Sequence, residues 1–249
     1  MKVLSGGCRV FGPGDGQIST QGNGTSRAVI CQASGARQIT QTVCMYGPGR
    51  SPTLVNPVAE EVLYAAQGEG ACNVNGWTYD LQPGTGIYIP PGAEYSIENP
   101  GPGSLRMVSA CCPEDPNRHA VANPRAAIAG DAPRLAVHER DREVIRAGKD
   151  REFRYLVHTD LGCRQVTQFV GWIPPSKAPF HFHEYEEGAF ILEGYGVVHV
   201  DGESCEFGPG SSIYFPKGVR HCVENPGSAP IRLLGVFYPS GSPSAAYED

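Results

Sequence analysis

Three histidines and one glutamate lie close together in the C-terminal part of the chain. His181, His183 and Glu187 fall within seven residues, and His221 follows a turn-rich segment. Side chains alternate between the two faces of a β-strand, so a strand that begins at His181 would point residues 181, 183 and 187 to one face. Imidazole and carboxylate ligands suit Mn²⁺, Fe²⁺, Co²⁺, Ni²⁺ or Zn²⁺, and a six-coordinate ion would keep two open positions. The pattern therefore predicts a catalytic metal site.

The neighbours of these residues are assigned by the same alternation. Glu184 and Glu186 would point to the opposite face of the strand, where we expect them to be solvated. Cys222 would turn away from the metal beside His221, and we interpret it as a packing residue.

The elements that position this cluster belong to an internal repeat. A shift of 126 residues places Glu61–Pro113 on Glu187–Pro239 without a gap, and a shift of 127 places Arg37–Gln41 on Arg164–Gln168. The matching residues are mainly glycines and prolines of turns. Two copies of one pattern predict two domains with one fold.

Each copy has the pattern of an all-β domain. Asn75-Gly76 and Asp201-Gly202 separate short apolar runs, which is a strong hairpin signal because both turn residues need positive φ. Many short strands at even spacing predict two tandem β-barrels of the jelly-roll type. We predict an N-terminal barrel over residues 1–120, a connector and the start of the second copy over 121–150, and a C-terminal barrel over 151–249.

The N-terminal copy lacks the imidazoles. Val55, Pro57 and Tyr95 stand where the second copy has its three histidines, and Glu61 alone remains. We therefore expect a metal-free N-terminal barrel that serves as a scaffold or packs against the other one, with a ligand pocket as an open alternative.

The repeat also separates framework residues from candidate substrate contacts. The run Arg-Gln-x-Thr-Gln occurs in both copies, which favours a structural role for Arg164 and Gln168. Of the residues unique to the second copy, Lys177 and Arg220 could meet a substrate carboxylate, although a single residue of this kind is more often a surface charge. The full set of candidate contacts is Trp172, Lys177, Phe180, Tyr185 and Arg220.

The C-terminal copy resembles the cupin superfamily. The family's second motif, G-x5-P-x-G-x2-H-x3-N, is matched at Gly210, Pro216, Gly218, His221 and Asn225. Its first motif, G-x5-H-x-H-x3-4-E-x6-G, is matched at His181, His183, Glu187 and Gly194, with Pro175 in place of the first glycine. The resemblance implies a bicupin made of two jelly-roll (double-stranded β-helix) barrels. It also implies one divalent transition metal per chain, held by His181, His183, Glu187 and His221.

The resemblance favours a metal-dependent enzyme. We expect a non-haem iron or manganese dioxygenase or other oxidoreductase that acts on a small polar oxo- or enol-containing metabolite, with Zn, Ni or Co as other metals. A non-oxidative isomerase, decarboxylase or ureidoglycine aminohydrolase-like hydrolase is the alternative. The aminohydrolases carry a carboxylate near position 181 and a histidine near position 187, which counts against that activity. A small-ligand or sugar-binding module without turnover is a further alternative, and the family resemblance suggests a homodimer.

Composition excludes several other classes of protein. The 249 residues carry a net charge of −6 without a basic stripe, so we expect no nucleic-acid partner. No run of 18 apolar residues occurs, so we expect no membrane span. The first residues lack the apolar region of a signal peptide, and the nine cysteines show no paired spacing. These features predict reduced thiols in the cytoplasm.

Overall fold

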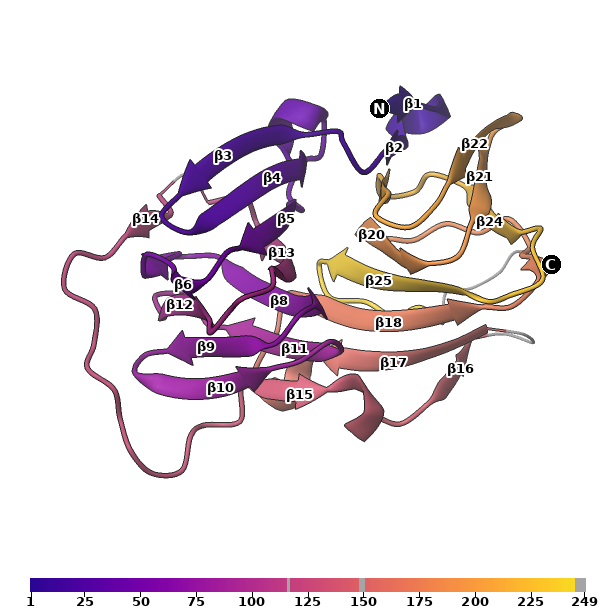
Figure 1. Cartoon of the computed structure of the whole chain (residues 1–249). Helices are drawn as coiled ribbons and strands as arrows, with labels where there is room; N and C mark the ends of the chain where they lie inside the picture. Colours follow the sequence, from indigo (N-terminus) through magenta and orange to yellow (C-terminus); the bar gives the residue numbers. More distant parts are fainter. Residues whose placement is uncertain (116, 148–150, 245–249) are drawn as a thin grey trace.

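The computed structural model describes residues 1–115, 117–147 and 151–244, and the regular structure in them is almost entirely β-strand. The helical elements of these residues are single 3-10 turns: η1 (Ser5–Gly7), η2 (Gln32–Ser34), η3 (Glu139–Asp141) and η4 (Thr159–Leu161). The predicted all-β class with two barrels is therefore confirmed (Figure 1). No helix in the described ranges has the length and apolar character that crossing a bilayer requires.

The first barrel is built from two antiparallel sheets. Its larger sheet has the order β15-β11-β8-β13-β5-β4-β3, with β3 (Gln17–Gln21), β4 (Gly24–Ile30), β5 (Gln41–Tyr46), β8 (Glu60–Gln67), β11 (Thr85–Ile89), β13 (Leu105–Cys112) and β15 (Ala136–His138). Its smaller sheet has the order β10-β9-β12-β7-β14, with β6 also paired to β12: β6 (Gly49–Arg50), β7 (Leu54–Val55), β9 (Gly70–Val74), β10 (Trp77–Leu81), β12 (Glu94–Asn99) and β14 (His119–Ala120).

The second barrel repeats this plan. Its larger sheet has the order β1-β2-β23-β20-β25-β18-β17-β16, with β1 (Lys2–Val3), β2 (Arg9–Phe11), β16 (Ile145–Ala147), β17 (Arg151–Val157), β18 (Thr167–Ile173), β20 (Glu186–Glu193), β23 (Ser212–Phe215) and β25 (Ile231–Tyr238). Its smaller sheet has the order β19-β24-β21-β22, with β19 (Ser176–Lys177), β21 (Gly196–Val200), β22 (Glu203–Phe207) and β24 (His221–Asn225).

The predicted hairpins are present in both barrels. Asn75 and Asp201 have φ of 51° and 44°, and the glycine after each has φ of 89° and 81°. Two successive residues with positive φ form the tight turn that matches the twist of the strands, which here are β9–β10 and β21–β22.

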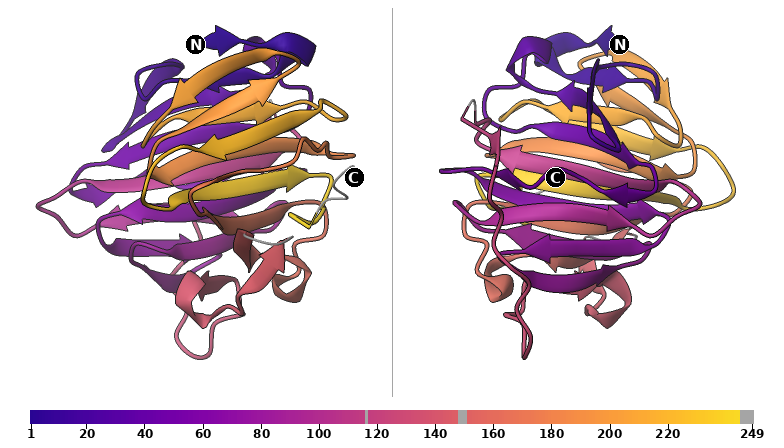
Figure 2. Two further views of the ribbon diagram at one scale, coloured as in Figure 1. Left: turned by 90° about the vertical axis from the view of Figure 1, so that its right-hand side faces the viewer. Right: turned by 60° about the vertical axis from the view of Figure 1, so that its left-hand side comes forward.

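The two barrels exchange a strand at their edges. Strand β2 pairs with β23 of the second barrel, and β15 pairs with β11 of the first. The two exchanged strands correspond to each other under the shift of 127 residues. The predicted domain boundaries need a correction, because β1 and β2 belong to the second barrel and part of the region 121–150 completes the first. Figure 2 shows the indigo N-terminal strands beside the orange strands of the second barrel.

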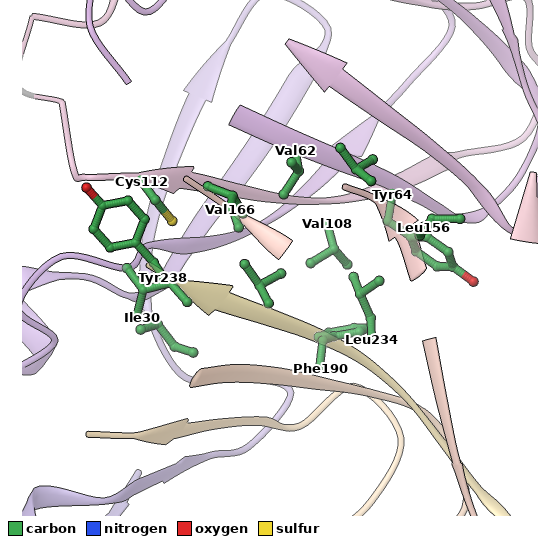
Figure 3. Packing of buried hydrophobic residues seen from close by; sticks show 14 of the residues in the cluster. Ile30, Val62, Tyr64, Val108, Cys112, Leu156, Val166, Phe190, Leu234 and Tyr238 are labelled. Atoms are coloured by element: carbon green, nitrogen blue, oxygen red, sulfur yellow. The ribbon is translucent and has the colours of Figure 1, made fainter. Parts of the chain in front are cut away.

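The larger sheets of the two barrels face each other across one apolar core. Its side chains come from both barrels, and the ones labelled in Figure 3 are Ile30, Val62, Tyr64, Val108, Cys112, Leu156, Val166, Phe190, Leu234 and Tyr238. Each barrel also has an apolar interior of its own. Both faces of each large sheet are therefore buried, which is why neither reads as a simple alternation of apolar and solvated residues.

Glu186 corrects one expectation from the sequence. Its side chain is buried, and its carboxylate accepts hydrogen bonds from the backbone N–H groups of Gln38 and Ile39, at 3.0 Å each, and of Arg37, at 3.2 Å. Alternation does turn Glu186 away from its own barrel, but that face is covered by the other barrel and not by water. Glu184 is solvated as predicted, with 72% of its side chain exposed.

Glu60 makes the matching contact in the opposite direction. Its carboxylate accepts hydrogen bonds from the backbone N–H groups of Arg164 at 3.0 Å and Gln165 at 2.8 Å. The tyrosine hydroxyls of Tyr88 and Tyr214 complete the two sites, each 2.9 Å from the glutamate of its own barrel. In both copies, backbone N–H groups of the repeated Arg-Gln run therefore contact a glutamate of the opposite barrel.

Removing the charge of Glu186 should weaken the pairing of the barrels. We expect Glu186→Gln to lower the free energy of unfolding by about 2 kcal/mol, because hydrogen bonds from three backbone N–H groups lose their ionised acceptor. Urea unfolding followed by tryptophan fluorescence measures the change. Glu184→Gln is the control and should change stability by less than about 0.5 kcal/mol. Equal losses in the two variants would contradict the role of Glu186.

Candidate metal centre

The candidate ligands converge from a loop and two strands of the second barrel. His181 and His221 form an isolated bridge through two backbone hydrogen bonds of 3.0 and 2.8 Å. His221 is the first residue of β24, and Glu187 is the second residue of β20. The strand predicted to begin at His181 therefore starts only at Glu186. His183 reaches the site from the segment before it, through a turn and not through strand alternation.

The spacing of the ligand atoms suits a single ion. One ring nitrogen from each of His181, His183 and His221 lies within 4.8 Å of the others, and all three side chains are buried. Nε2 of His183 is 3.2 Å from Oε2 of Glu187. Two donors at about 2.1 Å from one ion, at a right angle, are about 3.0 Å apart. The histidine triad can therefore hold a metal ion, with Glu187 adjacent to it.

Backbone carbonyls orient two of the imidazoles. Nδ1 of His181 is 3.2 Å from the carbonyl oxygen of Pro179, and Nδ1 of His221 is 2.9 Å from that of Val219. A carbonyl only accepts, so Nδ1 carries the proton and Nε2 keeps its lone pair. In the described part of the chain, Nδ1 of His183 is buried without a hydrogen-bond partner.

Burial also sets the charge of the cluster. It lowers the pKa of His181 to about 3 and that of His221 to about 4, and the neighbouring imidazoles act in the same direction on His181. Burial opposes ionisation of Glu187, but the hydrogen bond from His183 holds the pKa of this carboxyl below its usual range. Neutral imidazoles with an ionised carboxylate are the forms that bind a metal.

A small cavity of about 80 Å³ opens above the four residues. It offers room for a few water molecules or a small ligand. Apart from the candidate ligands its walls are mostly apolar, with rings and aliphatic groups from Phe153, Phe169, Phe207, Phe215, Leu233 and Phe237. A ligand in this cavity would be largely shielded from water.

Arg151 is the one arginine or lysine among the described lining residues. It begins β17, and its Nη2 donates to the carbonyl of Val223 at 2.8 Å. Sequence reasoning did not select it. A comparison of the two copies could have found it, because the corresponding residue of the first copy is Gly24. The positive charge therefore occurs only in the copy with the histidine triad.

Two of the predicted contact residues lie close to this site. Tyr185 stacks on the His183 ring, with centroids 5.0 Å apart and planes inclined by 14°, and its hydroxyl donates to the carbonyl of Ser242. Trp172 contributes to the cavity wall, but its ring lies near the guanidinium groups of Arg154 and Arg232, at 5.5 and 5.9 Å. Tyr185 therefore supports a candidate ligand from outside the cavity.

The other three predicted contacts are not brought to the cavity. Lys177 pairs with Glu224 at 3.1 Å, and half of its side chain is exposed. The guanidinium of Arg220 lies 5.2 Å from the centre of the Phe180 ring, beside a separate surface hollow. Lys177 ends the short edge strand β19, and Phe180 and Arg220 lie in loops.

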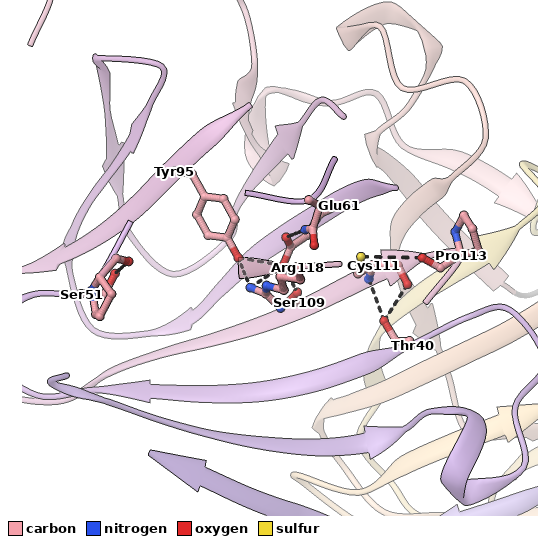
Figure 4. A network of polar contacts seen from close by, with 10 residues as sticks. Thr40, Ser51, Glu61, Tyr95, Ser109, Cys111, Pro113 and Arg118 are labelled. Atoms are coloured by element: carbon pink, nitrogen blue, oxygen red, sulfur yellow. Dashed lines mark hydrogen bonds and ion pairs between the residues drawn. The ribbon is translucent and has the colours of Figure 1, made fainter. Parts of the chain in front are cut away.

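The first barrel has a different cation at the corresponding place. Glu61, the counterpart of Glu187, is fully buried and lies 3.3 Å from Nη2 of Arg118. Its carboxylate also accepts hydrogen bonds from Tyr95 at 3.0 Å, from Ser109 at 2.5 Å and from Asn56 (Figure 4). Within the described residues, the histidine triad of the second barrel is the one cluster suited to a metal. A guanidinium group, supplied by the chain itself, balances the buried carboxylate of the first barrel.

Comparison with known proteins bears on both halves of the chain. The cupin domain model matches residues 42–111 and 169–237. An uncharacterised protein of Methanocaldococcus jannaschii is 40% identical over 89 residues, which cover 34% of this chain and 71% of that protein. Mannose-1-phosphate guanylyltransferase of Escherichia coli is 39% identical over 78 residues, 31% of this chain, but these span only 16% of the enzyme.

A solved structure extends the likeness to the whole fold. The crystal structure of oxalate decarboxylase from Lactobacillus farciminis, in complex with formate, aligns with a TM-score of 0.77. The alignment covers 94% of this chain and 87% of that one at 14% identity. At this identity the likeness concerns the arrangement of the two barrels and carries no reaction with it.

The triad should bind one ion in the second barrel. We expect the metal-free protein to bind about one Co²⁺ per chain, measured by visible absorption. His181→Ala or His221→Ala should weaken the affinity for Co²⁺ by a factor of about ten or more, because each variant removes one ligand. His199→Ala is the control, because His199 pairs with Glu224 away from the cavity. Full uptake by the two triad variants would show that the ion binds elsewhere.

The first barrel should depend on its internal ion pair. We expect Arg118→Met to lower the free energy of unfolding by about 3 kcal/mol, because Glu61 is left as a buried charge without a counter-charge. Adding Glu61→Gln should recover most of this loss. Urea titrations of the single and double variants measure both effects. A double variant as unstable as the single one would mean that Arg118 acts through packing alone.

Proposed function

Because the chain belongs to the cupin family and carries the family's domain twice, we propose that its second barrel is the catalytic half of a metal-dependent enzyme. The observation that carries this proposal is the convergence of His181, His183, Glu187 and His221 at one end of a small, mostly apolar cavity. These residues would hold one Fe²⁺ or Mn²⁺ ion. When bound, the ion would supply an electrophilic centre for a carbonyl, enol or carboxylate oxygen.

The cavity limits the substrates that we propose. Its volume of about 80 Å³ fits a small molecule. Its charged and polar lining residues are the candidate ligands, Arg151 and Glu152, and most of the others are phenyl or aliphatic groups. A small oxo- or enol-containing metabolite would place its oxygen toward the ligands and its carbon skeleton against the apolar walls. This arrangement matches the usual division of a ligand pocket into apolar walls and a few polar groups.

The residues around the ligands would have separate tasks. Arg151 would balance negative charge on an enolate or carboxylate substrate, since a charge-assisted hydrogen bond is strongest where water is excluded. Tyr185 would hold the His183 ring by stacking on it, and Phe215 packs on His221 with ring centroids 4.0 Å apart. Fixed rings keep the lone pairs aimed at one point, which is the condition for a stable ion site.

Oxygen-dependent chemistry is the reaction that we place first. Dioxygen is apolar, so the apolar walls would admit it beside the substrate, and the same walls would exclude the water that quenches reactive intermediates. An ion held by the four protein ligands would supply open coordination positions for small molecules, which oxygen-dependent chemistry requires. We therefore propose a dioxygenase or related oxidoreductase.

A non-oxidative decarboxylase or isomerase is the second candidate. The observation in its favour is Arg151, a cation placed to bind a substrate carboxylate, on a fold shared with oxalate decarboxylase. A purely sugar-binding role for the second barrel is less well supported, because its cavity walls are phenyl groups and not hydroxyls.

The nine cysteines are unpaired, which supports our proposal of a reducing, cytoplasmic setting. A homodimer remains a prediction from the family resemblance.

Oxygen consumption separates the two reactions. With Fe²⁺ restored under anaerobic conditions, we expect small 1,3-dicarbonyl compounds to be turned over only after oxygen is admitted, with one O₂ consumed per substrate on an oxygen electrode. His221→Ala should abolish this consumption. Arg151→Met should lower kcat/KM about tenfold or more, on the order of one lost charge-assisted hydrogen bond. Release of CO₂ from small oxo-acids without oxygen would instead establish the second candidate.

A further inference from the structure

The mouth of the first barrel has walls of a different chemistry from those of the second. A shift of 127 residues aligns β4 and β5 with β17 and β18. In this alignment two aromatic wall residues of the second barrel correspond to hydroxyl residues of the first: Phe153 to Ser26, and Phe169 to Thr42. Ser26 pairs with Cys44 as Phe153 pairs with Gly171, so the two barrels share one strand register at these positions. The duplicated fold therefore presents an apolar mouth in one barrel and a hydroxylated mouth in the other.

A cavity of about 280 Å³ occupies the mouth of the first barrel. This volume is near the lower end of the range of small-molecule pockets. Hydroxyl, amide and guanidinium groups line much of it, contributed by Ser19, Gln21, Ser26, Thr42, Tyr46 and Arg118. The cavity is thus larger and more polar than the one at the candidate metal centre.

Several of these polar groups keep hydrogen-bonding capacity for a ligand. Nε of Arg118 is buried and has no hydrogen-bond partner among the described residues, although 30% of the arginine side chain is exposed. The half-buried Thr42 hydroxyl and the exposed Gln21 amide make no side-chain hydrogen bond within the described ranges, whereas Ser19 and Ser26 bond to each other at 2.8 Å. A buried donor without a partner, such as Nε of Arg118, is costly, and a bound ligand relieves that cost.

The charge of the cavity favours a neutral ligand. The guanidinium of Arg118 is already balanced by Glu61 behind it, and no aspartate or glutamate is among the described lining residues. His119 is the other titratable base at the wall, and its Nδ1 lies 2.7 Å from the carbonyl of Asn117. An anion would therefore gain little from Arg118, because Glu61 already balances the guanidinium charge. The hydroxyl groups of a neutral molecule would find both hydrogen-bond donors and acceptors in the cavity.

We propose that the mouth of the N-terminal barrel is a second, metal-free ligand site that binds a small neutral polyhydroxylated molecule, such as a monosaccharide or polyol. Thr42, Gln21 and Arg118 would bond to its hydroxyl groups, and the Tyr46 ring would cover one side. This site does not depend on the reaction of the other barrel. The duplicated chain would then carry one site for turnover and one for recognition.

Binding of neutral sugars to the full-length protein tests the site. D-glucose, D-mannose, D-ribose and glycerol serve as probes by isothermal titration calorimetry and saturation-transfer NMR. We expect at least one to bind at millimolar concentration or better, and Thr42→Val to weaken it about fivefold, the loss of one hydrogen bond. Thr20→Val makes the same chemical change at a strand residue outside the cavity walls and should leave binding unchanged. His221→Ala should also leave it unchanged, because that variant alters only the second barrel.

Three results would overturn the proposal. Absence of binding by every probe up to 50 mM, a concentration about fifty times a 1 mM Kd, would exclude a neutral hydroxylated ligand of this kind. Loss of binding in His221→Ala but not in Thr42→Val would place the probes in the second barrel. Stronger binding of citrate or inorganic phosphate than of any neutral probe would make the mouth an anion site.

Discussion

Two buried carboxylates, one from each barrel, connect the halves of this molecule. Glu60 and Glu186 each accept backbone N–H groups from a loop of the opposite barrel. Such loops cannot enter an apolar interface unless their donors find acceptors, so the carboxylates make the close approach of the two large sheets possible. The same residues fix the register of β8 and β20. Because successive residues of a strand face opposite ways, anchoring Glu186 at the interface directs Glu187 into its barrel.

The duplicated fold therefore places a buried carboxylate at the same point in both barrels. The cation suited to balance that carboxylate differs between them. In the second barrel three imidazoles surround the position beside Glu187, which suits a bound transition metal. In the first, the guanidinium of Arg118 lies against Glu61. A buried carboxylate needs a counter-charge in either case. The histidine triad of the second barrel could take its counter-charge from solution as a metal ion, whereas the first barrel has a guanidinium from its own chain. The mouth of the first barrel therefore needs no metal ligands.

Much of this arrangement could be predicted from the sequence, and the failures have physical causes. Turn residues such as Asn75-Gly76 indicate hairpins because few other residues adopt positive φ at low cost. The all-β class and the repeat could therefore be predicted from the sequence. Glu186 was predicted to be solvated because strand alternation shows which face of the sheet a side chain occupies. It does not show whether water or another barrel covers that face. Arg151 and Arg118 were missed because each reaches its site from a segment outside the histidine-rich stretch, and only tertiary structure joins them.

Because the two barrels exchange strands, each barrel needs residues that are distant in the sequence before it can be completed. Strand β2 pairs with β23, where Arg9 lies opposite Tyr214, although the two strands are far apart in the sequence. Strand β2 consequently has no partner to dock on until the chain has been synthesised beyond β23. Contacts between such distant residues give a high contact order, which slows folding and makes the late steps concerted. In this chain the order of translation and the order of assembly differ, and neither barrel is completed by its own copy of the repeat alone.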